Sequence, residues 1–194
     1  MNEKTPETEN TGLPGAEAAV PKKAEVYDWI QCIVAALIIC VILFSFFFRL
    51  VDVIGSSMYP TLEDADKIIV SNLFYTPKQG DIIVFRKDSY KDEPLVKRII
   101  AVEGQTVDID FARGIVYVDG EALDEPYINE PTMQHLDFLG EITVPEGCVF
   151  VMGDNRNHST DSRDDRIGCV DVGYIMGKVY FTVFPIKNFG SDYH

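Results

Sequence analysis

The 194-residue sequence lacks the short motifs that bind metals and nucleotides. Its four cysteines include no C-x-x-C pair and its three histidines no H-E-x-x-H motif, so neither a zinc site nor a redox site is indicated. The phosphate-binding patterns G-x-x-x-x-G-K-S/T and G-x-G-x-x-G are also missing. We therefore expect no metal and no cofactor.

Basic residues are scarce. Lysine and arginine number 17 against 31 aspartates and glutamates, which gives a net charge of −14. Binding to nucleic acid requires clustered lysine and arginine, so a nucleic-acid partner is not expected. The ordinary effect of such an acidic balance is solubility.

The cysteines fall in two regions of the chain. Cys32 and Cys40 lie inside an apolar run, where cysteine acts as a small apolar side chain. Cys148 and Cys169 would be able to form a disulfide if their domain faced an oxidising compartment, and the sequence leaves their redox state open.

One long apolar run, residues 29–48, contains no charged residue. A helix of that length spans roughly 30 Å, the hydrocarbon thickness of a bilayer. A cleavable signal peptide has a shorter apolar region that ends in small residues, whereas this run ends in three phenylalanines and Arg49. We expect an uncleaved anchor over residues 25–50.

The basic residues beside the anchor predict its orientation. Lys22 and Lys23 precede it closely, whereas Arg49 stands alone after it. The positive-inside rule then predicts a single-pass protein of the cytoplasmic membrane with a cytoplasmic N-terminus. Residues 1–24 have the composition of a disordered cytoplasmic tail. Residues 51–194 are expected to form an extracytoplasmic domain.

This outer domain has the pattern of a mainly β fold. Short runs rich in β-branched and aromatic residues alternate with turn residues, and no helical period connects them. Residues 112–114 indicate a hairpin turn, and Gly177 interrupts the last run. The expected strands are residues 68–70, 82–85, 95–102, 106–111, 115–118, 148–152 and 174–184.

Two segments stand out for their chemistry. Residues 55–62 (GSSMYPTL) form a small-residue turn with two hydroxyls, and by composition alone they would be an ordinary surface turn. Ser57 follows Arg49 by eight residues, which reach at most about 27 Å, so it lies near the membrane surface. Residues 153–163 form a polar loop of turn-forming residues, which suits either solvent or a polar site.

A third segment, residues 95–102, places two adjacent cations in an apolar strand. Side chains alternate between the faces of a strand, so Lys97 and Arg98 are expected on opposite faces. Both would reach water if the strand lay at an edge. If one is held in an apolar pocket, only lysine can become a base, because burial lowers its pKa while arginine stays protonated.

Together these segments resemble the bacterial type I signal peptidases, which are serine-lysine peptidases. Residues 57–62 are similar to the family's nucleophile box, and residues 80–85 (GDIIVF) to the strand box that follows. Lys97-Arg98 resembles the general-base box, and residues 153–163 resemble the last box. All four occur in the family's order behind one anchor. The resemblance implies a mainly β fold built around a small barrel.

The resemblance also implies a role for individual residues. Ser57 would be the nucleophile and Lys97 the general base, with the Ser159 hydroxyl orienting the lysine. The structural ion-pair positions are Arg98, Asp154, Asp161 and Arg163. The substrate-pocket positions, which accept small side chains before the cut, are Met58, Leu62 and Val96.

The sequence departs from the family's pattern at two places. Gly55 stands where some members have a serine that helps to hold the oxyanion, so that group would depend on backbone N–H donors, with the second donor undetermined. Asn157 and His158 stand where aspartate and asparagine are common. The short interval between the last two boxes also leaves no room for the large second domain of some members.

The function that the resemblance implies is a membrane-bound serine endopeptidase that removes N-terminal signal peptides from secreted preproteins. Its partners would be those preproteins and the lipid bilayer, and its oligomeric state is not readable. One alternative is a serine-histidine-aspartate triad using His158, although Ser57 has no G-x-S-x-G elbow. A second alternative is a self-cleaving serine-lysine repressor. Such repressors are soluble and carry a DNA-binding segment, so the apolar run and the acidic net charge argue against this alternative. The last alternative is a catalytically silent, membrane-anchored β domain that binds exported proteins.

Overall fold

The computed structural model describes residues 22–87 and 90–190, so the predicted N-terminal tail lies almost wholly outside the described residues. The chain divides into a unit that ends at Ile42 and a unit that begins at Leu43. The first unit contains most of helix α1 (Lys22–Phe47). Within the part of the chain that the structure describes, α1 is the one helix long and apolar enough to cross a membrane, from Val26 to Ser45.

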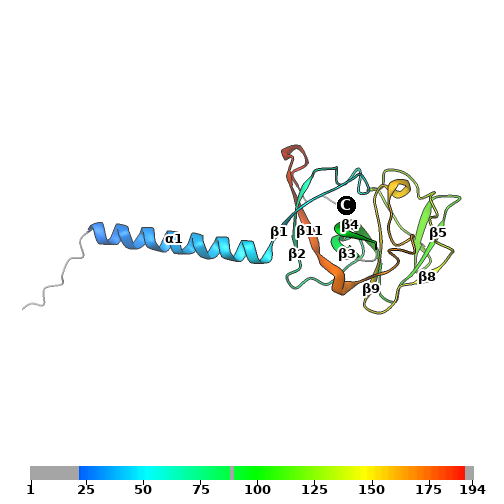
Figure 1. Ribbon diagram of the computed structural model, residues 1–194, viewed down its shortest axis with the longest axis horizontal. Helices are drawn as coiled ribbons and strands as arrows, with labels where there is room; N and C mark the ends of the chain where they lie inside the picture. The colour runs from blue at the N-terminus through cyan, green and yellow to red at the C-terminus, as the bar shows by residue number, and fades with distance from the viewer. Residues whose placement is uncertain (1–21, 88–89, 191–194) are drawn as a thin grey trace, which may run out of the picture. The chain divides into compact units, whose positions relative to one another are not determined.

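The second unit consists mainly of two antiparallel sheets, with short 3-10 helices after β9, β10 and β11 (Figure 1). The seven-stranded sheet has the order β1-β2-β11-β3-β4-β9-β10, with strands β1 (Arg49–Asp52), β2 (Lys67–Ser71), β11 (Ile175–Phe184), β3 (Ile82–Lys87), β4 (Lys91–Val102), β9 (Cys148–Met152) and β10 (Val170–Asp171). The four-stranded sheet has the order β7-β6-β5-β8, with strands β7 (Glu121–Ala122), β6 (Ile115–Val118), β5 (Thr106–Asp110) and β8 (Ile142–Thr143). The 3-10 helices are η1 (Arg156–His158), η2 (Val172–Tyr174) and η3 (Ile186–Asn188).

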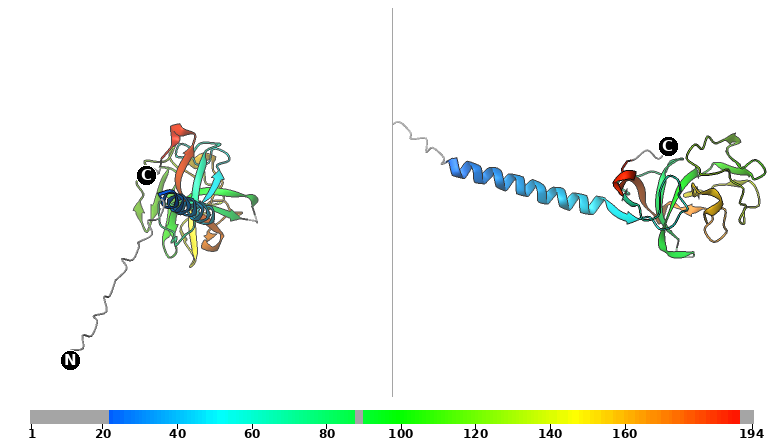
Figure 2. Two further views of the ribbon diagram at one scale, coloured as in Figure 1. Left: turned by 90° about the vertical axis from the view of Figure 1, so that its left-hand side faces the viewer. Right: turned by 90° about the horizontal axis from the view of Figure 1, so that it is seen from above.

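The mainly β prediction is confirmed, and every expected strand is present. β3 begins with four consecutive buried residues, as expected for a strand covered on both faces, whereas β11 alternates between buried and partly exposed positions. Figures 1 and 2 show β1 and β2 at one side of this unit and the four-stranded sheet at the other. All four cysteines are free thiols, including the Cys148 and Cys169 pair considered for a disulfide.

Gly177 does not end the last strand but marks an irregularity in it. The register between β11 and β3 shifts between Ile175 and Gly177. A Cβ at Gly177 would lie 2.6 Å from the backbone carbonyl of Ser71, so only glycine permits this close approach of β11 to β2.

Two features of this fold position the residues of interest. β4 lies between β3 and β9, with Lys97 opposite Ile83 and Arg98 opposite both Ile82 and Met152. Residues 53–66 form an irregular segment between β1 and β2 that carries Ser57. Backbone hydrogen bonds close the base of this segment, from Val53 N to Asp66 O and from Ala65 N to Val53 O, and so fix its position against the sheet.

Candidate active site

Ser57 and Lys97 meet at the edge of the apolar core. Lys97 Nζ lies 2.7 Å from Ser57 Oγ and donates a second hydrogen bond, of 2.9 Å, to the carbonyl of Val96. Forty residues separate the two side chains in sequence, so the pairing depends on how the segment before β2 folds over β4. A hydroxyl in hydrogen-bond contact with an amine is the geometry of a nucleophile beside its base.

The surroundings of Lys97 favour its neutral form. The residue is 3% exposed, and burial lowers the pKa of its amine to about 8, although the charges of Asp161 and Asp154 act in the opposite direction. Both of the hydrogen bonds described for it go to uncharged groups. A lysine with a pKa near 8 has a useful neutral fraction at neutral pH, which an ordinary exposed lysine lacks.

Gly153, the first residue after β9, brings the polar loop against Ser57. A Cβ at this position would overlap Ser159 Oγ and the carbonyl oxygen of Ser57. The same loop also holds the backbone of the nucleophile segment: Asn155 N donates to Ser57 O at 3.0 Å, and Asn155 Nδ2 donates to Ser56 O at 3.0 Å. Close packing at Gly153 therefore sets where Ser57 and Ser159 sit.

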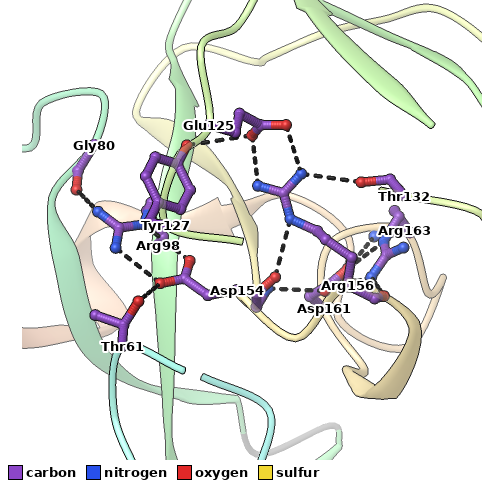
Figure 3. A network of polar contacts seen from close by, with 11 residues as sticks. Thr61, Gly80, Arg98, Glu125, Tyr127, Thr132, Asp154, Arg156, Asp161 and Arg163 are labelled. Atoms are coloured by element: carbon purple, nitrogen blue, oxygen red, sulfur yellow. Dashed lines mark hydrogen bonds and ion pairs between the residues drawn. The ribbon is translucent and has the colours of Figure 1, made fainter. Parts of the chain in front are cut away.

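Arg98 and Asp154 form a buried ion pair on the other side of β4. Arg98 donates two hydrogen bonds to the Asp154 carboxylate, of 2.9 and 2.8 Å, and a third to Gly80 O at 2.9 Å. Its guanidinium lies 3.8 Å from the centre of the Tyr127 ring, and the Thr61 hydroxyl also donates to Asp154 (Figure 3). The pair thus connects the nucleophile segment, β4 and the polar loop.

A second buried ion pair joins Asp161 to Arg163. The guanidinium donates to both carboxylate oxygens, at 2.8 and 2.9 Å, and Gly153 N donates to Asp161 at 3.0 Å (Figure 3). Burial alone would raise the pKa of Asp161, but hydrogen bonds and charge from Arg163 outweigh it and hold the pKa below its ordinary value, with a smaller contribution from Ser159. Asp161 is therefore a fixed negative charge beside Lys97.

The serine and the lysine lie beside tightly packed apolar side chains. Met58 and Leu62 are 1% and 0% exposed, and Val96 is 8% exposed. The three belong to one buried cluster with residues from β2, β3 and β11.

Comparison with known proteins identifies the family. A family model described as signal peptidase, peptidase S26, matches residues 26–184 of the chain. This chain belongs to the S26 signal peptidase family.

Members of the S26 family from several bacteria are similar to the chain over most of its length. The probable signal peptidase I-1 of Synechocystis sp. is 37% identical, with 84% of each chain covered. Signal peptidase I of Bacillus caldolyticus is 36% identical, covering 89% of this chain and 97% of the relative. A crystal structure of a signal peptidase I from Enterococcus faecalis is 32% identical, with a TM-score of 0.46 over 54% of this chain and 97% of that one.

The structure brings together most of the positions that the S26 resemblance named, but two remain without a described role. Ser159 is buried, and its hydroxyl has no hydrogen bond of normal geometry among the described residues. Gly55 is exposed, adopts a φ of +87°, and its N–H donates to Asp64 at 2.6 Å. A side chain at Gly55 would meet open space, so its backbone conformation is what favours glycine there.

Sequence reasoning missed several residues that support the S26 site. Arg156 is fully buried and pairs with Glu125 at 2.5 Å, and it also donates to Thr132 at 3.0 Å (Figure 3). Tyr127 stacks on Arg98. Glu125, Tyr127 and Thr132 lie between β7 and β8 in a stretch without a recognisable motif, so no sequence signal pointed to them.

Neither of the two described histidines forms a triad with Ser57. The His158 side chain is 70% exposed, and its charged neighbour is Glu130 at 4.0 Å. His135 stacks on Phe111, with ring centres 3.7 Å apart, and His194 lies outside the described residues. Within the described ranges, no group of three or more His, Cys, Asp or Glu side chains is placed to hold a metal ion.

Proposed function

We propose that this chain is a membrane-bound serine endopeptidase that removes signal peptides from secreted preproteins, with Ser57 as nucleophile and Lys97 as general base. The observation that carries the proposal is the 2.7 Å contact between Lys97 Nζ and Ser57 Oγ, on a lysine whose burial favours the neutral amine. The substrate class follows from the S26 family and from relatives named signal peptidase I.

The reaction is acyl transfer in two steps. Neutral Lys97 takes the proton of Ser57 as Oγ attacks the scissile carbonyl, and the resulting ammonium then gives that proton to the leaving amine. In the second step Lys97 takes a proton from water, which attacks the acyl-enzyme ester and releases Ser57. One lysine thus acts as base and then as acid in each step, and no histidine is required.

The tetrahedral intermediate requires hydrogen-bond donors for its oxyanion. Because Gly55 has no side chain, those donors are backbone N–H groups, and that of Ser57 is the one we assign. Ser159, packed against Gly153 beside the nucleophile segment, is the hydroxyl that we assign to orient the Lys97 amine. We also assign Met58, Leu62 and Val96, which share one buried apolar cluster, to the pocket that accepts small side chains before the cut.

The proposed location is the cytoplasmic membrane, crossed once by α1 with the N-terminus in the cytoplasm. The apolar stretch from Val26 to Ser45 supports the span, and Lys22 and Lys23 before it support the orientation. The second unit then acts outside the membrane, where the cleavage sites of preproteins emerge.

The test is cleavage of a preprotein with an Ala-x-Ala site, in detergent, by the wild type and by variants. Ser57→Ala should abolish cleavage, and Lys97→Ala should lower kcat/KM by about 10²- to 10⁴-fold, the usual contribution of a general base. Ser56→Ala is the matched control, because Ser56 is the exposed neighbouring hydroxyl and should be dispensable.

Three outcomes would contradict parts of this scheme. Cleavage that survives Lys97→Ala would remove the lysine from the chemistry. Loss of cleavage in His158→Ala would point to a triad instead. Absence of cleavage and of serine labelling in the wild type would favour the silent binding domain.

A further inference from the structure

A hollow of about 560 Å³ lies within the second unit, where the chain passes from the end of α1 into β1. Its walls come from the end of α1, the start of β1, the ends of β2 and β3, and the segment of η2 that leads into β11. The Ser71 hydroxyl donates to the carbonyl of Phe47 at 2.8 Å, which ties the end of β2 to the end of the helix. The hollow is therefore fixed to the end of the anchor.

The charge of this hollow is opposite to that of the whole chain. Arg49 and Arg86 both line it, and no aspartate or glutamate does. Neither arginine forms an ion pair with a carboxylate in the described part of the chain, whereas the nearby Lys67 pairs with Asp52 at 2.5 Å. In a chain with 31 acids and 17 bases, two arginines in one hollow without a carboxylate partner among residues 22–87 and 90–190 indicate a site for an anionic ligand.

The depth of the hollow suggests which anion it meets. Arg49 follows Ser45, the last residue of the apolar span, by four residues, which extend about 6 Å as helix and at most about 14 Å extended. The headgroup layer of a bilayer is about 5–8 Å thick on each side. Leu73 and Tyr174, which are 42% and 52% exposed, also line the hollow, and tyrosine is enriched at this depth.

We propose that this hollow binds the phosphate of an anionic phospholipid headgroup between Arg49 and Arg86. Guanidinium groups suit phosphate because they donate paired hydrogen bonds in one plane. The inference rests on the proposed membrane anchoring but not on its direction, because the hollow lies at the C-terminal end of α1 in either orientation. The bound lipid would hold the second unit at the membrane surface.

The experiment uses the full chain in nanodiscs that contain phosphatidylglycerol and phosphatidylcholine, with native mass spectrometry of the lipids it retains. We expect the wild type to retain phosphatidylglycerol preferentially, and Arg49→Gln/Arg86→Gln to lower that preference by roughly tenfold to thirtyfold. Arg113→Gln removes one positive charge, as each of the single variants Arg49→Gln and Arg86→Gln does, and is their control because Arg113 is 73% exposed and lies outside the hollow. Its preference should equal that of the wild type.

A preference that persists in the double glutamine variant, or that falls equally in Arg113→Gln, would overturn the proposal. Displacement of the lipid by millimolar inorganic phosphate would instead assign the hollow to a soluble anion. Should the double variant misfold, Arg49→Lys/Arg86→Lys keeps the charge and should keep part of the preference, and each single glutamine variant should lose part of it. Failure to enter nanodiscs would refute the anchoring, whereas loss of peptide cleavage in detergent would concern only the proposed enzyme activity.

Discussion

Lys97 accepts the Ser57 proton only as a neutral amine, so its pKa of about 8 sets the pH dependence of the proposed reaction. Below pH 8 most molecules carry the charged form, and kcat/KM should fall about tenfold for each pH unit. Above pH 8 it should level off. The measurement is kcat/KM on a soluble peptide from pH 6 to pH 10. A profile that is flat between pH 6 and pH 9 would exclude a lysine base with this pKa.

The same shift has an effect on stability with a definite sign. The folded pKa of Lys97 is lowered from 10.5 to about 8, so below pH 8 the folded protein holds a desolvated cation that the unfolded chain hydrates. This cost disappears as pH rises from 8 to 10.5. Lys97→Met should therefore unfold with a free energy roughly 3 kcal/mol higher at pH 7 and little different at pH 10.5.

Denaturant unfolding of the two proteins in the same detergent, at both pH values, measures this difference. An equal difference at the two pH values would show that packing, not charge, is responsible. The variant should be inactive, which would separate the requirement of the chemistry from that of the fold.

Gly153 is the other single residue on which the site depends. Its Cα faces Ser159 Oγ and the Ser57 carbonyl, so Gly153→Ala must displace one or both. A displacement of about 1 Å at a reacting group costs on the order of 100-fold in rate, and we expect kcat/KM to fall by at least that factor. Gly173→Ala is the control, because its Cβ would meet only the Asp171 carboxylate, at 3.0 Å. Equal activity in both variants would contradict the steric argument.

At the scale of elements, the polar loop that follows β9 contains only the short helix η1 as regular structure and is held mainly by ion pairs. Arg156 is its anchor, since it is fully buried and reaches Glu125 outside the loop. Glu125→Ala would leave that cation without its partner, so we expect a loss of about 3–5 kcal/mol in the free energy of unfolding. Glu63→Ala is the matched control, because Glu63 pairs with Lys187 at the surface and should cost less than about 1 kcal/mol.

Denaturant unfolding again measures both variants. A loss no larger in Glu125→Ala than in Glu63→Ala would mean that water reaches Arg156. Glu125→Ala/Arg156→Met removes both charges and should recover part of the stability, because the uncompensated cation is the main cost.

The elements differ in how far the sequence predicts them. β6 and β9 begin and end at the predicted residues, because both are short runs of apolar and aromatic residues bounded by turn formers. The strands β1, β7, β8 and β10 were not predicted. They have two to four residues each, and their existence depends on a neighbouring strand that no local pattern reveals.

The site residues were predicted by a different route from the strands. The motif residues were predicted from the family resemblance, because Ser57 and Lys97 are 40 positions apart and no local pattern predicts that they meet. The alternation of side chains along a strand predicted that Lys97 and Arg98 of β4 lie on opposite faces and have different surroundings. It did not predict that both would be buried, since burial of Arg98 requires Asp154 and Tyr127 from distant segments. Long-range partners of this kind are fixed by tertiary packing.

For the whole molecule, the proposed anchor makes cleavage a reaction between two partners in one membrane. Confinement to the same bilayer raises the effective concentration of the peptidase and the signal peptide, and linking of this kind gains about 10²- to 10⁴-fold. We therefore expect a preprotein in the same vesicles as the full chain to be cleaved at least about 100-fold faster than one in separate vesicles mixed at equal total concentration. A time course of processed product measures both rates.

Two controls distinguish confinement from other effects. Detergent, which merges the two vesicle populations, should make the rates equal, and a soluble peptide with the same cleavage site should be cleaved equally by both preparations. Equal rates for the preprotein before detergent is added would show that the catalytic unit reaches substrates across the aqueous phase. The apolar span from Val26 to Ser45 would then contribute location but no rate.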